Sequence, residues 1–227
     1  MNRVPPHWQG HRDRLRNRLL NRGSESLDDY ELLEVILFAV IPRKDVKPLA
    51  KRLLQHFGSL SAALAAHPSQ LQSIEGAGPV VASHFAAMRE IATRSARESI
   101  SMRPIVSSWA ALLGYVRAEL QHHTREQFRT LFLDRKNQLI ADEVLWLGTV
   151  DHAPVYPREI ARRALELAAS AVILVHNHPS GDPTPSSADI DMTRLIVDAL
   201  DPLDITVHDH LIVGREGVVS FKASGLI

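Results

Sequence analysis

The chain has 227 residues, of which 45% are hydrophobic, so it is long enough to form one large domain or two small ones. It has no cysteine, which excludes disulfide bonds and thiolate metal sites, and any metal must therefore be held by histidines and carboxylates. No apolar run approaches the ~18 residues of a membrane span and no signal segment opens the chain, so we expect a cytoplasmic protein with no membrane partner.

The charge is balanced overall but unevenly distributed. Residues 1–100 contain 14 Lys and Arg against 10 Asp and Glu, a net charge of +4, whereas residues 101–227 have a net charge of −4. Arginines recur at every second position from Arg12 to Arg18. This arginine run is compatible with a solvated helix face, and equally with weak affinity for a phosphate backbone or another acidic partner.

The first hundred residues have the apolar spacing that is typical of helices. The spacing predicts a helix over 26–40, with Ser26 as its N-cap, and a second helix over 45–58. A short helix and a long helix follow within 71–95 and are joined by Gly76-Ala77-Gly78. This turn resembles a helix-hairpin-helix element, whose backbone amides can hold a DNA phosphate. The alternative is a helical hairpin that needs glycine only in order to turn sharply.

The segment 98–108 lacks periodicity and contains a proline, which predicts a domain boundary. We expect a helical domain over 1–103 and a second domain over 104–227. In the second domain the predicted helices are 108–123, 157–170 and 186–200, and the predicted strands are 126–134, 138–148, 171–178, 205–214 and 218–221. Hairpin and crossover connections occur together, so these elements predict an α/β sandwich around a mixed sheet.

The segment HNHPSGDPTPSSAD, residues 176–189, follows a strand that is buried by its composition. His176 and His178 are two positions apart, so their side chains point to the same face. Asp189 falls in the first turns of the next helix, where it can bring a carboxylate to the two imidazoles. Two histidines and one carboxylate leave a fourth position on zinc for water, as in catalytic zinc sites. Zinc lowers the pKa of such a water to about 7.

Two alternatives concern the carboxylate. Ser186-Ser187-Ala188-Asp189 also matches a capping box, in which Asp189 would serve only its own helix. Asp182 is a rival ligand, but it lies in a turn between two prolines that its side chain can stabilise. Two histidines at this spacing beside a carboxylate form a rarer grouping, which favours the metal site with Asp189 as the third ligand.

At this point the residues resemble a known pattern. His-x-His, seven residues, Ser, two residues and Asp is the signature of JAMM (MPN+) metalloproteases, and it is formed here by His176, His178, Ser186 and Asp189. The resemblance implies Zn²⁺ as the cofactor and a fold of the JAMM/MPN type, which is cytidine-deaminase-like, for residues 104–227.

A wider resemblance covers almost the whole chain. The sequence VYPREI…HNHPSGDPTPSSAD…T…HDHLIVG, together with the helical front half, resembles the RadC family. The chain departs from the eukaryotic deubiquitinating JAMM members at Asn177, where Ser or Thr is usual. The side chain of Asn177 is expected to point away from the metal, so the departure argues against a ubiquitin-type substrate and not against metal binding.

The resemblance also implies catalytic residues. JAMM proteins use a glutamate at the start of an upstream strand as the general base, and Glu126 has that placement. Glu143 is the alternative base. Ser186 would donate a hydrogen bond to the oxyanion that forms when water attacks a carbonyl. For His208 and His210 we expect a structural role, or support of the metal ligands, in preference to a second metal site.

These features support two functions of different classes. The first is a zinc-dependent JAMM-type hydrolase, a metallopeptidase that cleaves a peptide or isopeptide-like amide. The second, which the resemblance to the RadC family implies, is a DNA-binding protein associated with DNA repair or recombination. Any DNA affinity is expected mainly in residues 1–100, where it should be weak and non-specific. The complete set of ligands favours the hydrolase, because a binding module has no need of an open-sided metal site.

Overall fold

A computed structural model describes residues 10–101, 104–148 and 156–227. The chain divides into two compact units, Met1–Ile91 and Ala92–Ile227. The domain boundary predicted between residues 103 and 104 stays a prediction, because residues 102 and 103 lie outside the described part of the chain. Within the described ranges, no helix is both long enough and apolar enough to cross a membrane.

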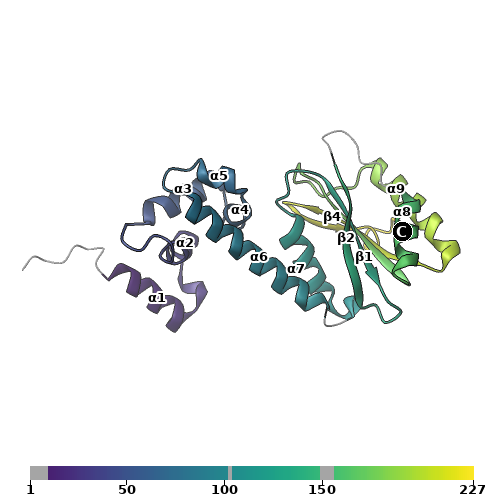
Figure 1. Cartoon of the computed structure of the whole chain (residues 1–227), viewed down its shortest axis with the longest axis horizontal. Coiled ribbons are helices and arrows are strands. Elements are labelled where there is room, and N and C mark those ends of the chain that lie inside the picture. Colours follow the sequence, from purple (N-terminus) through teal and green to yellow (C-terminus); the bar gives the residue numbers. More distant parts are fainter. Residues whose placement is uncertain (1–9, 102–103, 149–155) are drawn as a thin grey trace, which may run out of the picture. The chain divides into compact units, whose positions relative to one another are not determined.

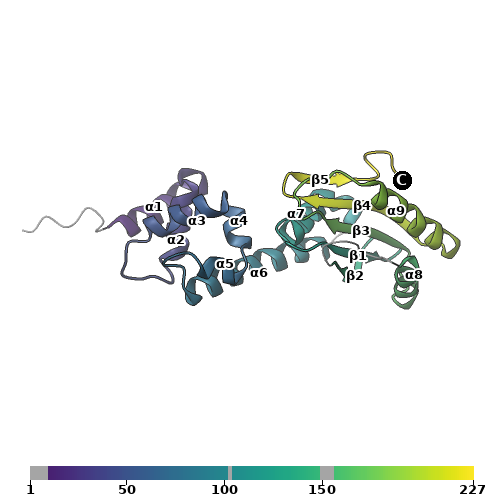
Figure 2. The same ribbon diagram turned by 90° about the horizontal axis from the view of Figure 1, so that it is seen from above.

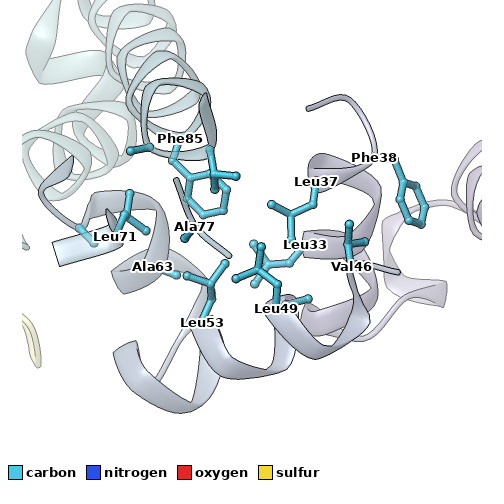
Figure 3. Close-up of a cluster of buried hydrophobic side chains, with 14 of the residues drawn as sticks. Leu33, Leu37, Phe38, Val46, Leu49, Leu53, Ala63, Leu71, Ala77 and Phe85 are labelled. Carbon is cyan, nitrogen blue, oxygen red and sulfur yellow. The ribbon is translucent and has the colours of Figure 1, made fainter. Parts of the chain in front are cut away.

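The N-terminal unit is built from helices (Figure 1). They are α1 (His11–Arg22), the 3₁₀ helix η1 (Ser24–Ser26), α2 (Asp29–Leu37), α3 (Lys47–Phe57), α4 (Leu60–Ala65), α5 (Pro68–Gln72) and the first part of α6 (Pro79–Ser101). Their apolar faces meet in a core where Leu33, Leu53 and Phe85 have no exposed surface (Figure 3). Burying one such side chain stabilises the fold by about 1.5–3 kcal/mol.

The helix ends show where local prediction succeeds and where it fails. The helix predicted over 45–58 is confirmed, because α3 ends at Phe57 and Gly58 follows with φ 82° as a left-handed C-cap. The prediction of Ser26 as the next helix's N-cap is wrong. Asp28 is the N-cap, because its carboxylate and the side chain of Glu31 form a reciprocal capping box.

The arginine run lies on α1, and two of its members hold the N-terminal unit together. The Arg12 guanidinium donates to the backbone carbonyls of Ile41 at 2.6 Å and Lys44 at 2.7 Å. Arg18 forms an ion pair with Glu31 at 2.8 Å. The run is therefore not simply a solvated stripe, since these arginines fasten α1 to α2 and to the segment that follows α2.

The C-terminal unit contains a mixed sheet with helices packed on it. Its elements include α7 (Trp109–Leu120), β1 (Gln127–Leu133), β2 (Leu139–Leu147), α8 (Pro157–Glu166), β3 (Ala171–Asn177), α9 (Ser187–Leu200), β4 (Thr206–Gly214) and β5 (Gly217–Ser220), with 3₁₀ turns η2 (Ile105–Ser108) and η3 (Asp201–Leu203). The strand order is β2-β1-β3-β4-β5. β3 and β4 are parallel and joined through α9, while the other neighbouring pairs are antiparallel. The predicted mixed α/β fold with five strands is confirmed.

The helices pack on opposite faces of this sheet. α7 covers one face, and α8 and α9 lie together on the other (Figures 1 and 2). Along β3, Ile173 and Val175 belong to the core under α7, whereas Val172 and Leu174 belong to the core under α8 and α9. Side chains alternate between faces along a strand, so His176 lies on the face covered by α8 and α9.

Candidate metal centre

Three side chains at the end of β3 and the start of α9 converge. Nε2 of His176 lies 2.9 Å from Nε2 of His178 and 3.3 Å from Oδ1 of Asp189. Nε2 of His178 lies 3.4 Å from Oδ2 of Asp189. In a tetrahedral zinc site with bonds of about 2.0–2.2 Å, ligand atoms lie roughly 3.3–3.6 Å apart. The two distances from histidine to carboxylate, each to a different oxygen of Asp189, lie in this range, whereas the two imidazole nitrogens are closer together and would have to move apart to share one ion.

The turn after β3 is held against the end of β4. The backbone N–H of His178 donates to the carbonyl of Val213 at 3.0 Å. Gly181 has φ 106°, a conformation that favours glycine. Gly214 allows the turn to approach β4, since a Cβ at that position would lie 2.2 Å from the carbonyl oxygen of Gly181. These two glycines let the chain reverse while His178 stays beside His176.

A backbone carbonyl sets the protonation of the His178 ring. Nδ1 of His178 lies 2.9 Å from the carbonyl oxygen of Asp182. A carbonyl can only accept, so Nδ1 donates. In the protonated ring Nε2 donates to Asp189, and in the neutral ring Nε2 is unprotonated and free to bind a metal. The carboxylate of Asp182 instead accepts the N–H of Thr184 at 2.9 Å and is not part of the cluster. The Asp182 carboxylate therefore stabilises the turn and lies outside the cluster.

Asp189 takes part in both the cap and the cluster. Its Oδ2 accepts the backbone N–H and the hydroxyl of Ser186, each at 2.7 Å, which completes the capping box of α9. Burial acts to raise the pKa of Asp189, but hydrogen bonds with His176 and His178 outweigh it and hold the pKa well below its ordinary value. Asp189 therefore presents an ionised carboxylate to the two histidines.

The two candidate bases have different surroundings. Glu126 is partly buried immediately before β1. The pKa of His178 is raised mainly by its hydrogen bond with Asp189. The negative charge of Glu126 also raises the pKa of His178, so the Glu126 carboxylate acts electrostatically on the cluster. Glu143, on β2, instead accepts two hydrogen bonds from Arg163 on α8, at 2.6 and 2.7 Å, and this pairing lowers the pKa of Glu143. The Glu143 carboxylate is thus engaged between β2 and α8.

Asn177 lies between the two histidines, and its side chain is turned toward the beginning of β1. Its Oδ1 accepts the N–H of Gln127 at 2.9 Å, and its Nδ2 donates to the carbonyl of Arg125 at 3.1 Å. These bonds attach the backbone on both sides of Glu126 to the end of β3. The amino-acid sequence gave no sign of this link, because the bonded residues are about fifty positions apart.

His210 and Thr193 do not belong to the cluster but are connected to it by hydrogen bonds. Nδ1 of His176 is 2.8 Å from Nε2 of His210, which is fully buried, and Nδ1 of His210 is 2.6 Å from Oγ1 of Thr193. Burial lowers the pKa of His210 well below its ordinary value, so its ring is neutral. His208 is directed elsewhere, with Nε2 2.6 Å from Oδ1 of Asn137. Thr193 had no role in the sequence-based prediction, although its position four residues after Asp189 on the same helix was a usable signal.

Fold and site together define a class of protein, namely a mixed α/β domain that carries a His-His-Asp cluster at the end of a central strand. Two protein families match the chain. The RadC-like JAB domain matches residues 106–226, and the UPF0758 N-terminal family matches residues 7–83. The first match covers more than half of the chain and includes the whole cluster. The chain belongs to the RadC family, as the sequence resemblance predicted.

Proposed function

We propose that this protein is a zinc-dependent hydrolase of the JAMM type, a metallopeptidase that cleaves a peptide or isopeptide-like amide. The observation that carries the proposal is the convergence of His176, His178 and Asp189, whose donor atoms lie 2.9–3.4 Å apart. Two imidazoles and a carboxylate are hard-to-intermediate donors that suit zinc and leave one position open. A JAMM/MPN sandwich of the cytidine-deaminase-like type is the corresponding fold.

Each residue has a role in this proposal. His176, His178 and Asp189 would hold the ion, which supplies a Lewis acid and a water that is activated at neutral pH. Glu126 would accept the proton of the attacking water and deliver it to the leaving amine. Ser186, whose hydroxyl donates to Asp189, would turn to donate to the oxyanion of the substrate.

The test is metal content measured by elemental analysis on protein purified without chelator, followed by an activity screen of the zinc-loaded protein against a peptide library. We expect one zinc ion per chain in the native protein and loss of that ion in Asp189→Ala. Asp182→Ala is the matched control, because it removes a nearby carboxylate that lies outside the cluster. Full zinc occupancy in Asp189→Ala, or absence of zinc in the native chain, would overturn the proposal.

We propose a second function for the N-terminal unit, which is weak and non-specific binding of DNA. Two observations support it. The net charge of residues 1–100 is +4, and α5 and α6 are joined by a tight turn in which Gly76 has φ 90°. Such a turn is compatible with a helix-hairpin-helix element that offers backbone amides to a phosphate.

A further inference from the structure

Two buried side chains connect two of the proposed ligands through an unbroken chain of hydrogen bonds. From His176 on β3 the chain passes to His210 on β4, at 2.8 Å, and then to Thr193 on α9, at 2.6 Å. The hydroxyl of Thr193 donates to the backbone carbonyl of Asp189 at 2.6 Å. This series of hydrogen bonds therefore begins at His176 and ends on the backbone of Asp189.

The direction of every hydrogen bond follows from its last acceptor. The carbonyl of Asp189 can only accept, so the single hydroxyl proton of Thr193 is directed to it. The oxygen of Thr193 is then left to accept the Nδ1 proton of His210. A neutral His210 with its proton on Nδ1 has an unprotonated Nε2, which accepts the Nδ1 proton of His176. In the neutral form of His176, which is the form that can bind a metal, Nε2 is consequently unprotonated, and this atom faces His178 and Asp189.

We propose that Thr193 and His210 are positioning residues that fix the tautomer of His176, so that its unprotonated Nε2 is presented to the metal. This proposal rests on the zinc site proposed above. Partners that bond the second nitrogen of a ligand histidine fix its tautomer and ring orientation, and their loss typically lowers metal affinity about 10–100-fold.

Among the described residues, His176 and Thr193 are the hydrogen-bond partners of the His210 ring. His210 is 1% exposed and Thr193 has no exposed surface, so bulk solvent does not reach these two side chains. Apolar rings pack around His210, with ring centroids 5.7 Å away for Phe128 and 4.6 Å away for Phe221. Thr193 is therefore the group on which the orientation of the His210 proton depends.

The experiment is Thr193→Val, which keeps the shape of the side chain and removes the hydroxyl. We expect zinc affinity, measured by competition with a chromogenic chelator, to fall about 10–100-fold. In the metal-free protein at mildly alkaline pH, ¹⁵N NMR of the histidine rings should show that His176 loses its preference for the Nδ1-protonated tautomer. Thr193→Ser retains a hydroxyl and should restore both the affinity and the tautomer.

Thr130→Val is the matched control. Thr130 is fully buried on β1, and its hydroxyl has no hydrogen-bond partner among the residues that the structure describes, so the same replacement should change neither readout. His210→Phe provides a second variant that removes both ring nitrogens. It should reduce zinc affinity as Thr193→Val does, and the double variant should be no weaker than His210→Phe alone, since both changes break one chain.

The two proposals can fail separately. An unchanged His176 tautomer and unchanged zinc affinity in Thr193→Val would overturn the positioning role. If Thr193→Ser fails to restore the tautomer, the hydroxyl is not its cause and the proposal is also overturned. If the native protein binds no zinc but Thr193→Val shifts the tautomer and Thr193→Ser restores it, the hydrogen-bond chain is supported and the zinc-dependent function falls.

Discussion

The carboxylate of Asp189 accepts two hydrogen bonds from Ser186, one from the backbone N–H and one from the hydroxyl, each at 2.7 Å. The same carboxylate lies 3.3 Å from His176 and 3.4 Å from His178. Asp189 can therefore complete the capping box of α9 and belong to the cluster at the same time. The N-cap fixes the carboxylate at the start of α9, where the two histidines meet it.

Asp189→Asn should separate the two roles. Its amide oxygen can still accept from Ser186, so the stability of the metal-free protein should change little, while loss of the negative charge should lower zinc affinity strongly. Asp189→Ala should lose the metal and also the half of the capping box that its carboxylate supplies, which is worth up to about 1 kcal/mol, while Ser186 remains the N-cap. Zinc stoichiometry and urea unfolding of the metal-free variants measure both effects. A stable Asp189→Asn variant with full zinc would show that the residue is only a cap.

Glu126→Gln should leave zinc bound and reduce turnover by about 10²–10⁴, because the amide keeps its size but cannot accept the proton. Glu143→Gln is the control. It breaks the partly exposed ion pair with Arg163, which is worth up to about 1 kcal/mol, and should leave turnover within a few-fold of the native value. Steady-state kinetics on zinc-loaded protein decide the assignment. Loss of turnover in Glu143→Gln alone would assign the base to Glu143.

Zinc affinity should fall as the pH is lowered, beginning above pH 6.5. The hydrogen bond with Asp189 raises the pKa of His178 above its ordinary value of 6.5, and the metal needs the unprotonated Nε2. The stability that protonated His178 gives the metal-free protein is present below the unfolded pKa and is lost as pH rises through the raised pKa. The melting temperature of the zinc-loaded protein should consequently exceed that of the metal-free protein by more and more as the pH rises through the raised pKa of His178. A difference independent of pH would contradict the assignment of His178.

Residues 104–227 should fold alone and bind zinc, because all proposed ligands lie there. A fragment over 92–227 should be more stable by about 1.5–3 kcal/mol, since it retains Ile100, which is fully buried in the core under α7. Urea unfolding of both fragments measures the difference. A fragment that is insoluble or metal-free, while the full chain binds zinc, would refute the two-domain division.

DNA affinity should reside in the N-terminal unit and decrease at least about tenfold between roughly 50 and 200 mM salt, as phosphate contacts require. Arg16 has a half-exposed side chain, so Arg16→Ala should weaken binding and reduce the salt dependence. Arg162→Ala, an exposed arginine of α8, is the control and should change nothing. Fluorescence anisotropy with a duplex of arbitrary sequence measures these effects. Equal binding by the isolated 92–227 fragment would contradict the assignment.

Most helices and strands could be predicted from the sequence, because the spacing of apolar residues, the turn residues and most helix ends depend on short stretches of the chain. The strand over 171–178, the helix over 186–200 and the His-x-His spacing between them could all be predicted in this way. The errors have local causes too. Asp28 takes the cap predicted for Ser26 because it can pair reciprocally with Glu31, and α4 was not predicted because its six residues are too few to show a period.

The tertiary structure alone decided which distant groups meet at the cluster. The sequence presented Glu126 and Glu143 as alternatives, but the sheet order places the second opposite Arg163 on α8, where it forms an ion pair. The same order puts β4 beside β3, so that His210 contacts His176 across 34 positions. Such partners depend on strand order and helix packing, which no local spacing specifies, because a hydrogen bond requires its two groups within about 3 Å whatever their separation along the chain.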